Sequence, residues 1–174
     1  MRSARVCLRS PKPSDAPEFL RRVRESRRLH RPWVSPPHAP DRFQAWLRRG
    51  RRKDYAAFLI CRREDGALVG VINVSQIYLG NLRSAYLGYY AFAPFAGQGY
   101  MTEGMALVLR RAFGELGLHR VEANVQPGNR DSLRLLRRCG FRREGFSLRY
   151  VKVGGRWRDH ERWALTKEDR RSRG

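Results

Sequence analysis

The sequence predicts an α+β protein whose helices flank a mixed, mostly antiparallel sheet, and three observations lead to this class. Apolar segments between Tyr55 and Phe92 are separated by tight turns, which is typical of antiparallel strands. A glycine loop at 97–99 is followed by a helical pattern and another strand, which indicates a crossover to a parallel neighbour. The final third has the pattern of a hairpin. We expect residues 1–174 to form one domain, with a core over about residues 5–166.

The amino-terminal part predicts a short edge strand and two helices. The strand spans Arg5–Arg9 and is closed by prolines. Asp15 followed by Glu18 has the spacing of a capping box and opens a helix that ends at His30–Trp33. Asp41 starts the second, shorter helix. Both helices carry runs of Arg, which are either a solvated face or a docking surface for RNA or an acidic partner.

Three antiparallel strands are expected in the middle of the chain, over Tyr55–Cys61, Leu68–Tyr78 and Ser84–Phe92. The dipeptide Asp65-Gly66 is a strong hairpin signal, and Gly80-Asn81 makes a second turn. Counting the edge strand, four sheet elements precede the glycine loop.

The glycine loop lies within Tyr89–Gly104 and joins a strand to the best-defined helix of the chain. Gly97 and Gly99 let the backbone approach a ligand, and the free N–H groups at a helix start point at an anion. The helix has a regular apolar stripe and ends at Gly117. We therefore expect this loop to bind the pyrophosphate of a coenzyme.

The strand Arg120–Gln126 has one polar face, formed by Glu122, Asn124 and Gln126. A strand that follows a crossover helix normally lies inside the sheet and is covered on both faces. Polar side chains in that position indicate that this face borders a wet cleft.

The carboxy-terminal part predicts a short helix and a hairpin. The helix spans Arg130–Cys139 and is closed by the C-cap glycine Gly140. The hairpin strands are Gly145–Val153 and Trp157–Thr166, with a diglycine turn between them. The charged tail from Lys167 to the end, residues 167–174, is expected to fray.

Charge is the unusual feature of the composition: 37 Lys and Arg residues against 16 Asp and Glu give a formal net charge of +21. Such a surplus favours long-range attraction to nucleic acid, a ribosome, an anionic membrane or an acidic ligand. An Arg-rich but ordinary solvated surface would give the same composition. The sequence leaves both explanations open.

Cysteine usage and hydropathy bear on where the protein acts. Cys7, Cys61 and Cys139 are odd in number and contain no CxxC pair, which favours reduced thiols over a disulfide framework or a zinc site. The basic start is not followed by an apolar run, and no stretch has the length of a membrane span. We therefore expect a cytoplasmic protein with no metal and no membrane partner.

Three segments in this order resemble the GNAT acetyltransferase family. Gly97–Met101 resembles the family's acetyl-CoA loop, and Asn129–Ser132 with Gly140-Phe141 resembles its N-x-x-S…G-F segment. His30–Trp33, the run QGYMTE and Gly155–His160 are similar to the RimJ/RimL branch, the ribosomal-protein-alanine N-acetyltransferases. The resemblance covers roughly residues 5–166.

The resemblance implies an acetyl-CoA co-substrate and a sheet that splays between its fourth and fifth strands to admit the pantetheine arm. A backbone N–H near Phe92 would then stabilise the oxyanion. Coenzyme contacts are expected from Phe92, Gly97, Gln98, Gly99, Tyr100, Met101, Thr102, Asn129 and Ser132.

The chain departs from the family pattern at three positions. Ala96 and Met101 stand at the first and last positions of the coenzyme loop. Met101 fits the RimJ-like branch, whereas Ala96 removes a side chain and leaves pyrophosphate binding to backbone amides. Leu136 stands where many relatives carry a tyrosine that protonates the leaving thiolate. Either Ser132 positions the thiol, as the resemblance implies, or no dedicated acid is needed, since a thiol pKa of roughly 8.5 makes a tolerable leaving group.

Glu122 is the first candidate for a general base, because it lies on the polar face of the inner strand. The alternative is that it pairs with one of the many Arg residues. A strong base is optional for an α-amino group, whose pKa is about 8, and less so for a lysine near 10.4. His160, beside Asp159, is a second candidate, although a residue on a terminal hairpin strand more often packs structurally.

Three aromatic residues are candidates for the acceptor site. Trp33 lies between two helices and either walls the acceptor site or packs in the core. Tyr89 and Tyr90 alternate along one strand, so only one of them can face the cleft. Tyr150 would face Asp159 if the hairpin turns at the diglycine pair.

The leading hypothesis is a direct transfer of acetyl from acetyl-CoA to the N-terminal amine of a protein, such as a ribosomal protein, within one ternary complex. The first alternative changes the acceptor to a small amine, such as an antibiotic, a polyamine or an amino acid. The second is a non-catalytic ribosome- or RNA-binding protein on the same fold. The sequence allows either a monomer or a homodimer.

Overall fold

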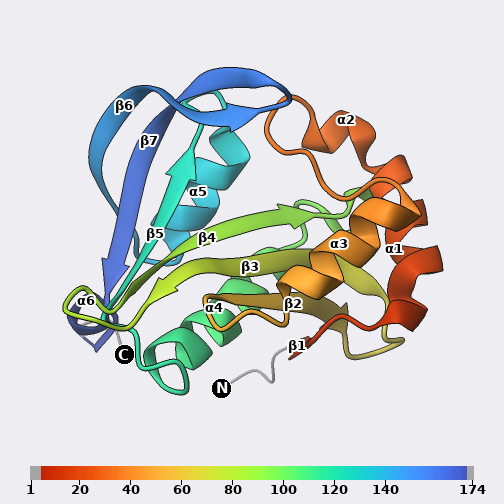
Figure 1. Cartoon of the computed structure of the whole chain (residues 1–174), viewed down its shortest axis with the longest axis horizontal. Helices are drawn as coiled ribbons and strands as arrows, with labels where there is room; N and C mark the ends of the chain where they lie inside the picture. Colours follow the sequence, from red (N-terminus) through yellow and green to blue (C-terminus); the bar gives the residue numbers. More distant parts are fainter. Residues whose placement is uncertain (1–4, 172–174) are drawn as a thin grey trace.

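The computed structural model describes residues 5–171 and shows an open seven-stranded mixed sheet with helices on both faces (Figure 1). The strands are β1 (Val6–Arg9), β2 (Tyr55–Arg62), β3 (Leu68–Tyr78), β4 (Ser84–Ala91), β5 (Arg120–Val125), β6 (Arg142–Val153) and β7 (Arg156–Thr166). The helices are α1 (Ala16–Glu25), α2 (Arg27–His30), α3 (Pro40–Arg49), α4 (Tyr100–Phe113), α5 (Arg130–Arg138) and α6 (Lys167–Arg171). Short 3-10 turns, η1 (Pro13–Asp15) and η2 (Ala93–Phe95), precede α1 and the glycine loop.

The order of strands across the sheet is β1-β2-β3-β4-β5-β7-β6. All neighbours are antiparallel except β4 and β5, which pair in parallel across the crossover helix α4. The predicted α+β class, the edge strand, the central meander and the carboxy-terminal hairpin are therefore confirmed.

The two faces of the sheet carry different helices. In β2, Ile60 lies against Gly104 of α4, so that a Cβ at Gly104 would come within 2.5 Å of the Ile60 side chain. Tyr55 is on the opposite face and accepts the indole N–H of Trp46 in α3 at 3.1 Å. The strands are therefore sandwiched between α4 and α5 on one side and α1–α3 on the other.

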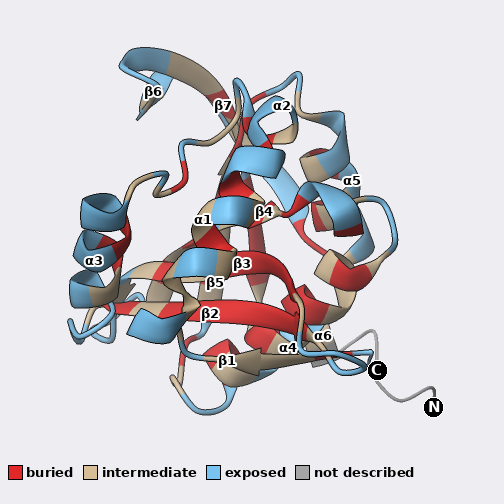
Figure 2. Cartoon of the chain, turned by 90° about the vertical axis from the view of Figure 1, so that its right-hand side faces the viewer, coloured by how far each residue is buried: buried red, intermediate tan, exposed pale blue. Residues whose placement is uncertain are grey.

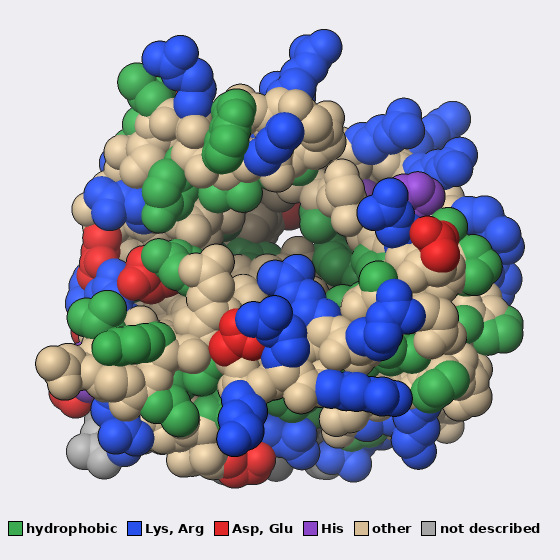
Figure 3. Space-filling model, viewed as in Figure 1, with side chains coloured by type: hydrophobic (Ala, Val, Ile, Leu, Met, Phe, Trp, Pro, Cys, Tyr) green, Lys and Arg blue, Asp and Glu red, His purple; other side chains and the backbone are tan. Residues whose placement is uncertain are grey.

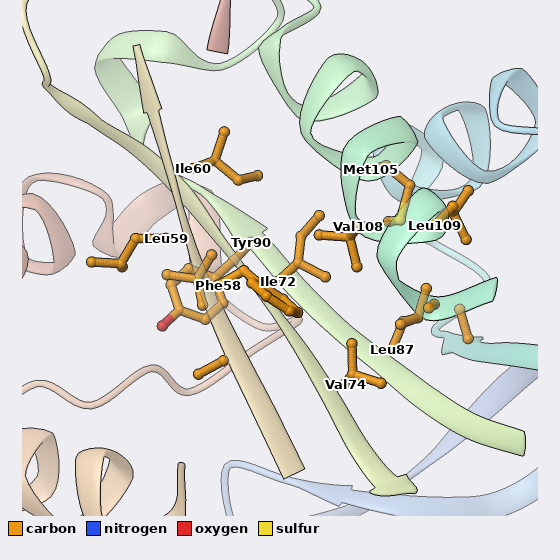
Figure 4. Packing of buried hydrophobic residues seen from close by; sticks show 14 of the residues in the cluster. Phe58, Leu59, Ile60, Ile72, Val74, Leu87, Tyr90, Met105, Val108 and Leu109 are labelled. Carbon is orange, nitrogen blue, oxygen red and sulfur yellow. The ribbon is translucent and has the colours of Figure 1, made fainter. Parts of the chain in front are cut away.

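The apolar stripe of α4 forms one half of the core. Figure 4 shows Met105 and Val108 of α4 facing Ile72 of β3, and all three are fully buried. Burial of a side chain of this size stabilises the fold by about 1.5–3 kcal/mol. In Figure 2 the buried residues lie on the central strands and the inward sides of the helices, while the outward sides are exposed.

An aromatic cluster forms the other half of the core and fixes the amino-terminal helices to the sheet. Phe19 of α1 packs against Phe43 and Trp46 of α3, with ring centroids 4.9 and 5.1 Å apart. It also meets Phe92, just after β4, edge-on at 5.8 Å. The cluster therefore holds the helical layer at the end of β4.

The strands β4 and β5 part after a short ladder. They pair only at Ser84–Tyr86 with Arg120–Glu122, and beyond these residues they diverge (Figure 1). From Leu87 to Ala91, one edge of β4 therefore has no strand partner among residues 5–171. This is the splay that the sequence led us to expect between the fourth and fifth strands.

The capping box predicted at Asp15 and Glu18 does not form. Asp15 instead makes a bidentate pair with Arg9, at 2.8 and 2.7 Å. Glu18 accepts the backbone N–H of Leu68 at 3.1 Å. Both carboxylates are used in tertiary contacts, which local spacing does not reveal.

Ser26 divides the predicted first helix into α1 and α2. Its hydroxyl donates to the Arg22 carbonyl at 2.6 Å and accepts the Ala93 N–H at 2.8 Å. The side chain therefore ties the helical layer to the chain just after β4. It leaves α2 as a separate turn that ends at His30.

Two carboxy-terminal boundaries also differ from the prediction. The helix α4 ends at Phe113 rather than at Gly117, which instead sits in the following turn with a φ of +61°. The tail predicted to fray forms α6, because Asp169 accepts hydrogen bonds from the Thr166 N–H and hydroxyl at 2.9 and 2.7 Å. Residues 172–174 lie outside the described part of the chain. Among residues 5–171, no helix is long and apolar enough to cross a membrane.

Candidate active site

A cavity of about 720 Å³ opens where β4 and β5 part. Its walls come from both faces of the sheet: the glycine loop and α5 on one side, and α2 with the segment after it on the other. The edges of β4 and β5 and the hairpin β6–β7 complete it. Figure 3 shows a hollow near the centre of this face. The volume falls in the usual range for small-molecule sites, roughly 300–1,000 Å³.

The glycine loop has the backbone conformation that the sequence predicts. Gly97 and Gly99 have φ values of +75° and +83°, and Gly99 is the N-cap of α4. Residues with a Cβ adopt this conformation only at a cost. Both glycines line the cavity. The N–H groups of Gly99, Tyr100 and Met101 have no acceptor among residues 5–171, so they are free to bind an anion.

An ion pair braces the loop from outside. Glu103 accepts the backbone N–H and the Nε of Arg5, both at 2.7 Å. The same guanidinium donates to the Gln98 carbonyl at 2.9 Å and lies 4.4 Å from the centre of the Tyr100 ring. The side chains of Gln98 and Tyr100, both expected at the coenzyme, are used elsewhere: Gln98 donates to the Pro94 carbonyl at 2.8 Å and the Tyr100 ring meets Arg5. Met101 and Thr102 line the cavity, and at Tyr100 only the backbone N–H remains for a ligand.

The start of α5 contributes the other predicted coenzyme residues. Asn129 is the N-cap, and its side-chain oxygen accepts the Ser132 N–H at 3.2 Å. The Ser132 hydroxyl lies 2.7 Å from the Tyr89 hydroxyl, and Asn129, Ser132 and Tyr89 all line the cavity. Tyr89 points to this face because its neighbour Tyr90 points to the other, where its ring meets that of His30 at 5.2 Å.

The Ser132–Tyr89 pair can offer one hydroxyl proton to the cavity, since either oxygen can be the donor between them. Burial raises the pKa of Tyr89 well above its usual value, so this hydroxyl stays protonated at neutral pH. Leu136, one turn further along α5, is fully buried and packs in the core.

The backbone N–H of Phe92 itself is used within the sheet and does not face the cavity. It points to β3 and donates to the Val69 carbonyl at 2.8 Å, and the Phe92 side chain is fully buried. Backbone directions alternate along an antiparallel strand, so the N–H of Ala91 points to the opposite edge, which faces the cavity. Near Phe92, the N–H that faces the cavity is therefore that of Ala91.

His30 is a cavity residue whose place in the site the sequence did not reveal. It ends α2, is 4% exposed, and its Nε2 lies 2.8 Å from the Ala91 carbonyl. A carbonyl only accepts, so Nε2 carries the proton and Nδ1 does not if the ring is neutral. Burial lowers the pKa of His30, which keeps the ring neutral at pH 7. The ring therefore holds the free edge of β4 in place.

The polar face of β5 reaches the cavity at two of its three predicted positions. Asn124 and Gln126 line it, and Gln126 donates to the Trp33 carbonyl at 3.3 Å. The Trp33 ring lies against Gly128, where a Cβ would come within 3.0 Å. Trp33 thus walls the cavity, and it also packs on the turn after β5.

Glu122 lies outside the cavity. Its carboxylate pairs with Arg120 on the same strand at 2.9 Å, and Arg120 also bridges to Glu144. This matches the alternative of an Arg pair. The side chain instead approaches Tyr86, whose pKa is raised to about 12 by burial, by its contact with Tyr150 and by the charge of Glu122.

Tyr150 does not reach the cavity either, because the hairpin bulges. Ser147 pairs with His160 and Val151 with Arg158, so three residues oppose Asp159 alone. The bulge is held by the Arg149 N–H, which donates to Asp159 at 2.8 Å. As a result Val151 lines the cavity and Tyr150 is turned away.

Gly88 is a second cavity residue that sequence patterns missed. It is exposed although it lies in a central strand, and a Cβ built on it would meet no atom within 4 Å. The absence of a side chain there keeps the cavity open on the α3 side. A glycine within a strand carries no sequence signal that distinguishes this role from a bulge.

Charge is unevenly distributed around the cavity. Arg134 and Arg138 of α5 line it, and Asp131 is the only carboxylate among its lining residues. His160 also lines it, buried, with Nδ1 2.8 Å from the Arg158 carbonyl. Among residues 5–171 there is no group of three or more His, Cys, Asp or Glu side chains that could hold a metal ion.

An open mixed sheet that parts between two parallel strands, with free helix-start amides at the parting, offers a site for an anionic ligand. The model of the acetyltransferase (GNAT) domain matches residues 5–142, and the chain belongs to this family.

Relatives support the same assignment. A probable N-acetyltransferase of Bacillus subtilis, YjcK, is 41% identical over 112 residues, which are 64% of this chain and 62% of that protein. The [ribosomal protein uS5]-alanine N-acetyltransferase of Escherichia coli is 36% identical over 106 residues, 61% of this chain and 55% of that protein. The matches thus span less than two thirds of these relatives' own length.

Solved structures match over nearly the whole chain. RimJ of Mycobacterium smegmatis, in complex with CoA-disulfide, has a TM-score of 0.86 at 33% identity, covering 94% of this chain and 83% of that one. A spermidine N-acetyltransferase of Vibrio cholerae, in complex with CoA and spermine, has a TM-score of 0.81 at 19% identity, covering 96% and 98%. The second likeness concerns the fold alone.

Proposed function

We propose that this protein is an acetyl-CoA-dependent N-acetyltransferase that acetylates the N-terminal α-amino group of a protein by direct transfer in a ternary complex. The observation that carries the proposal is the cavity at the parting of β4 and β5. It brings the free loop amides, the Ser132–Tyr89 pair and the free edge of β4 into one space. Family membership and the ribosomal-protein-alanine N-acetyltransferases among the relatives agree with it.

The residues present fit coenzyme A. The unpaired N–H groups of Gly99, Tyr100 and Met101 at the start of α4 suit a pyrophosphate. Arg138 adds positive charge, whereas Arg134 is paired with Asp131. Bound there, the coenzyme supplies an acetyl thioester as the activated group. Ala96 offers no side-chain donor, so the backbone does this binding.

The chain's own groups cover the remaining chemical needs. The Ala91 N–H can donate to the carbonyl oxygen that gains charge, and His30 fixes this peptide through the neighbouring carbonyl. As the C–N bond forms and the C–S bond breaks, one proton must pass from the amine to the departing thiolate. The Ser132 hydroxyl, backed by Tyr89, can give its proton to the thiolate and take up the proton that the amine loses, so the pair ends as it began. An α-amino acceptor with a pKa of about 8 is partly neutral at cellular pH, so the distance of Glu122 from the cavity is no obstacle.

The charge of the lining favours a protein N-terminus over a polyamine. A polycationic acceptor would need several carboxylates, and the cavity lining has Asp131 alone, on α5 beside the coenzyme loop. The net charge of +21 likewise repels polyamines and suits an encounter with substrate on or near a ribosome.

The test is thiol release from acetyl-CoA with a panel of alanine-terminated peptides, spermidine, amino acids and aminoglycosides. We expect turnover with peptides and little with the small amines. Turnover of a small amine alone would replace the acceptor class, and the absence of any turnover together with salt-sensitive RNA binding would favour a non-catalytic role. Mass spectrometry of protein N-termini from cells with and without the protein would then identify the acceptor.

A further inference from the structure

A second cavity of about 480 Å³ adjoins the first on the α3 side of the sheet. One wall is the segment 34–38, and the other is α3 with the strand residues beneath it. Val34 and Tyr90 line both cavities, so the two spaces share a wall. Gly88 lines the first cavity, and its cross-strand partner Asn73 lines the second. Gly88 adds no side chain to the surface of β4 beside Tyr90, and a Cβ built there would meet no atom within 4 Å.

The floor of the second cavity is aromatic and rigid. The Trp46 indole N–H is shared between the Tyr55 hydroxyl and the Asn73 side-chain oxygen, each at 3.1 Å. Pro36 and Pro37 stiffen the opposite wall. Tyr90 is only 7% exposed, and its buried hydroxyl has no hydrogen-bond partner among residues 5–171. A pre-formed groove of this kind suits an extended peptide, because the walls are already rigid and lose little conformational entropy when the peptide binds.

The rim of the groove is positively charged. His38, Arg42 and Arg49 line it, and its lining residues include no Asp or Glu. Arg49 lies over the Tyr55 ring at 4.7 Å, which directs its guanidinium to the groove. Arg42 has only a loose contact of 3.7 Å with Asp41, in which both side chains are more than 70% exposed. Both guanidinium groups are therefore available to a carboxylate ligand.

We infer that this groove holds the part of the acceptor polypeptide that follows its reacting N-terminus, and that it selects acceptors with Asp or Glu within the first few residues. The inference rests on the proposed function, because it takes the first cavity as the place of the acceptor amine. The open space at Gly88 supplies the path, and the charge of Arg42 and Arg49 supplies the selection. A polynucleotide fits this groove less well, because the positive side chains that it would need along its whole backbone lie on one rim only, opposite a wall that contains two prolines.

The experiment compares three peptides of equal length that begin with Ala and carry Glu, Gln or Lys at positions two to four. With the wild-type chain we expect kcat/KM for the Glu peptide to exceed that for the Gln peptide by about 10-fold, mainly through KM, because charge-assisted hydrogen bonds act in binding. The double variant Arg42→Ser/Arg49→Ser should reduce this ratio to about 2 or less, and Arg42→Glu/Arg49→Glu should favour the Lys peptide.

The matched control removes two charges nearby without touching the groove. Arg48→Ser/Arg51→Ser changes two exposed residues of the same region that do not line the groove, and it should keep the preference for Glu. Equal loss in both double variants would assign the preference to the long-range field of the chain and overturn the groove. Equal kcat/KM for the three peptides would overturn the inference and leave the proposed function standing. Failure to acetylate any peptide would overturn both.

Discussion

The two sides of the main cavity are built by different means. On the proposed coenzyme side, Gly97–Thr102 and Asn129–Ser132 contribute mostly backbone conformation and helix starts, each within a few consecutive residues. On the proposed acceptor side, His30, Trp33 and Asn124 come from distant parts of the chain and contribute side chains. Backbone conformation over a few consecutive residues leaves a local sequence motif. Alternation along a strand also predicted Asn124 at the cleft, whereas no sequence pattern revealed the contact between His30 and the Ala91 carbonyl.

The largest effect should follow a change in the backbone of the coenzyme side. Gly99→Val places a branched side chain at φ +83°, and the loop must shift to relieve the strain. Losing two charge-assisted hydrogen bonds would weaken coenzyme binding by about 100-fold or more. Calorimetric titration with coenzyme A measures this directly.

Gly66→Val is the control for strain alone. Gly66 has a similar φ of +74° and open space around it, but it lies in the β2–β3 hairpin, away from the cavity. It should cost about 1–2 kcal/mol of stability and leave coenzyme affinity unchanged. Normal affinity in Gly99→Val would show that the loop does not hold the coenzyme.

The acceptor side should be most sensitive at Gly88. Gly88→Leu places its Cβ in open space between the two cavities, so the chain should fold normally while kcat/KM for peptide acceptors falls by about 100-fold. Gly104→Ala is the opposite case, because its Cβ meets Ile60 at 2.5 Å. It should lower the free energy of unfolding by about 1–3 kcal/mol with little change in specificity. If Gly88→Leu leaves kcat/KM unaltered, the acceptor does not pass this point.

A smaller effect is expected where the two sides meet, at the Ser132–Tyr89 pair. Ser132→Ala should lower kcat by about 10- to 30-fold, less than general acids usually contribute, because a thiolate leaves readily. Tyr89→Phe should have a smaller effect, and the double variant should match Ser132→Ala, since the two hydroxyls act as one unit. Additive losses in single-turnover assays would contradict this coupling.

The smallest effect concerns stability and pH at His30. Burial lowers the pKa of His30 below 6.5, so the unfolded chain binds a proton that the folded chain does not. The stability contributed by the neutral ring is therefore complete above the unfolded pKa and is lost as the pH falls towards the folded value. Between about pH 7.5 and about pH 5.5, the wild-type chain should lose more free energy of unfolding than His30→Gln. Parallel pH profiles in urea titrations would refute a buried neutral ring.

The sequence predicted the elements well because their signals are local. Leu68–Tyr78 has the predicted bounds, and the parallel pairing of β4 with β5 follows from the crossover helix. Two details of the site could not be predicted. The N–H of Phe92 points towards β3 because of the order in which hydrogen-bonded and non-hydrogen-bonded residues alternate along β4. A bulge in the hairpin turns Tyr150 away from the cavity. Neither the hydrogen-bond phase of a strand nor a bulge opposite Asp159 can be derived from alternation alone.

The ladder of backbone hydrogen bonds between β4 and β5 is short, so the sheet is held together least firmly beside the cavity. Three residue pairs, from Ser84–Arg120 to Tyr86–Glu122, join the first four strands to the last three. Past them, thermal opening of the two halves meets little resistance from the backbone. A ligand that contacts both β4 and β5 would hold the two parts of the sheet together. It would therefore slow amide hydrogen exchange along residues 87–91 of β4. Occupation of the proposed site should therefore make the sheet more rigid at the parting of β4 and β5, and release of the ligand should reverse this.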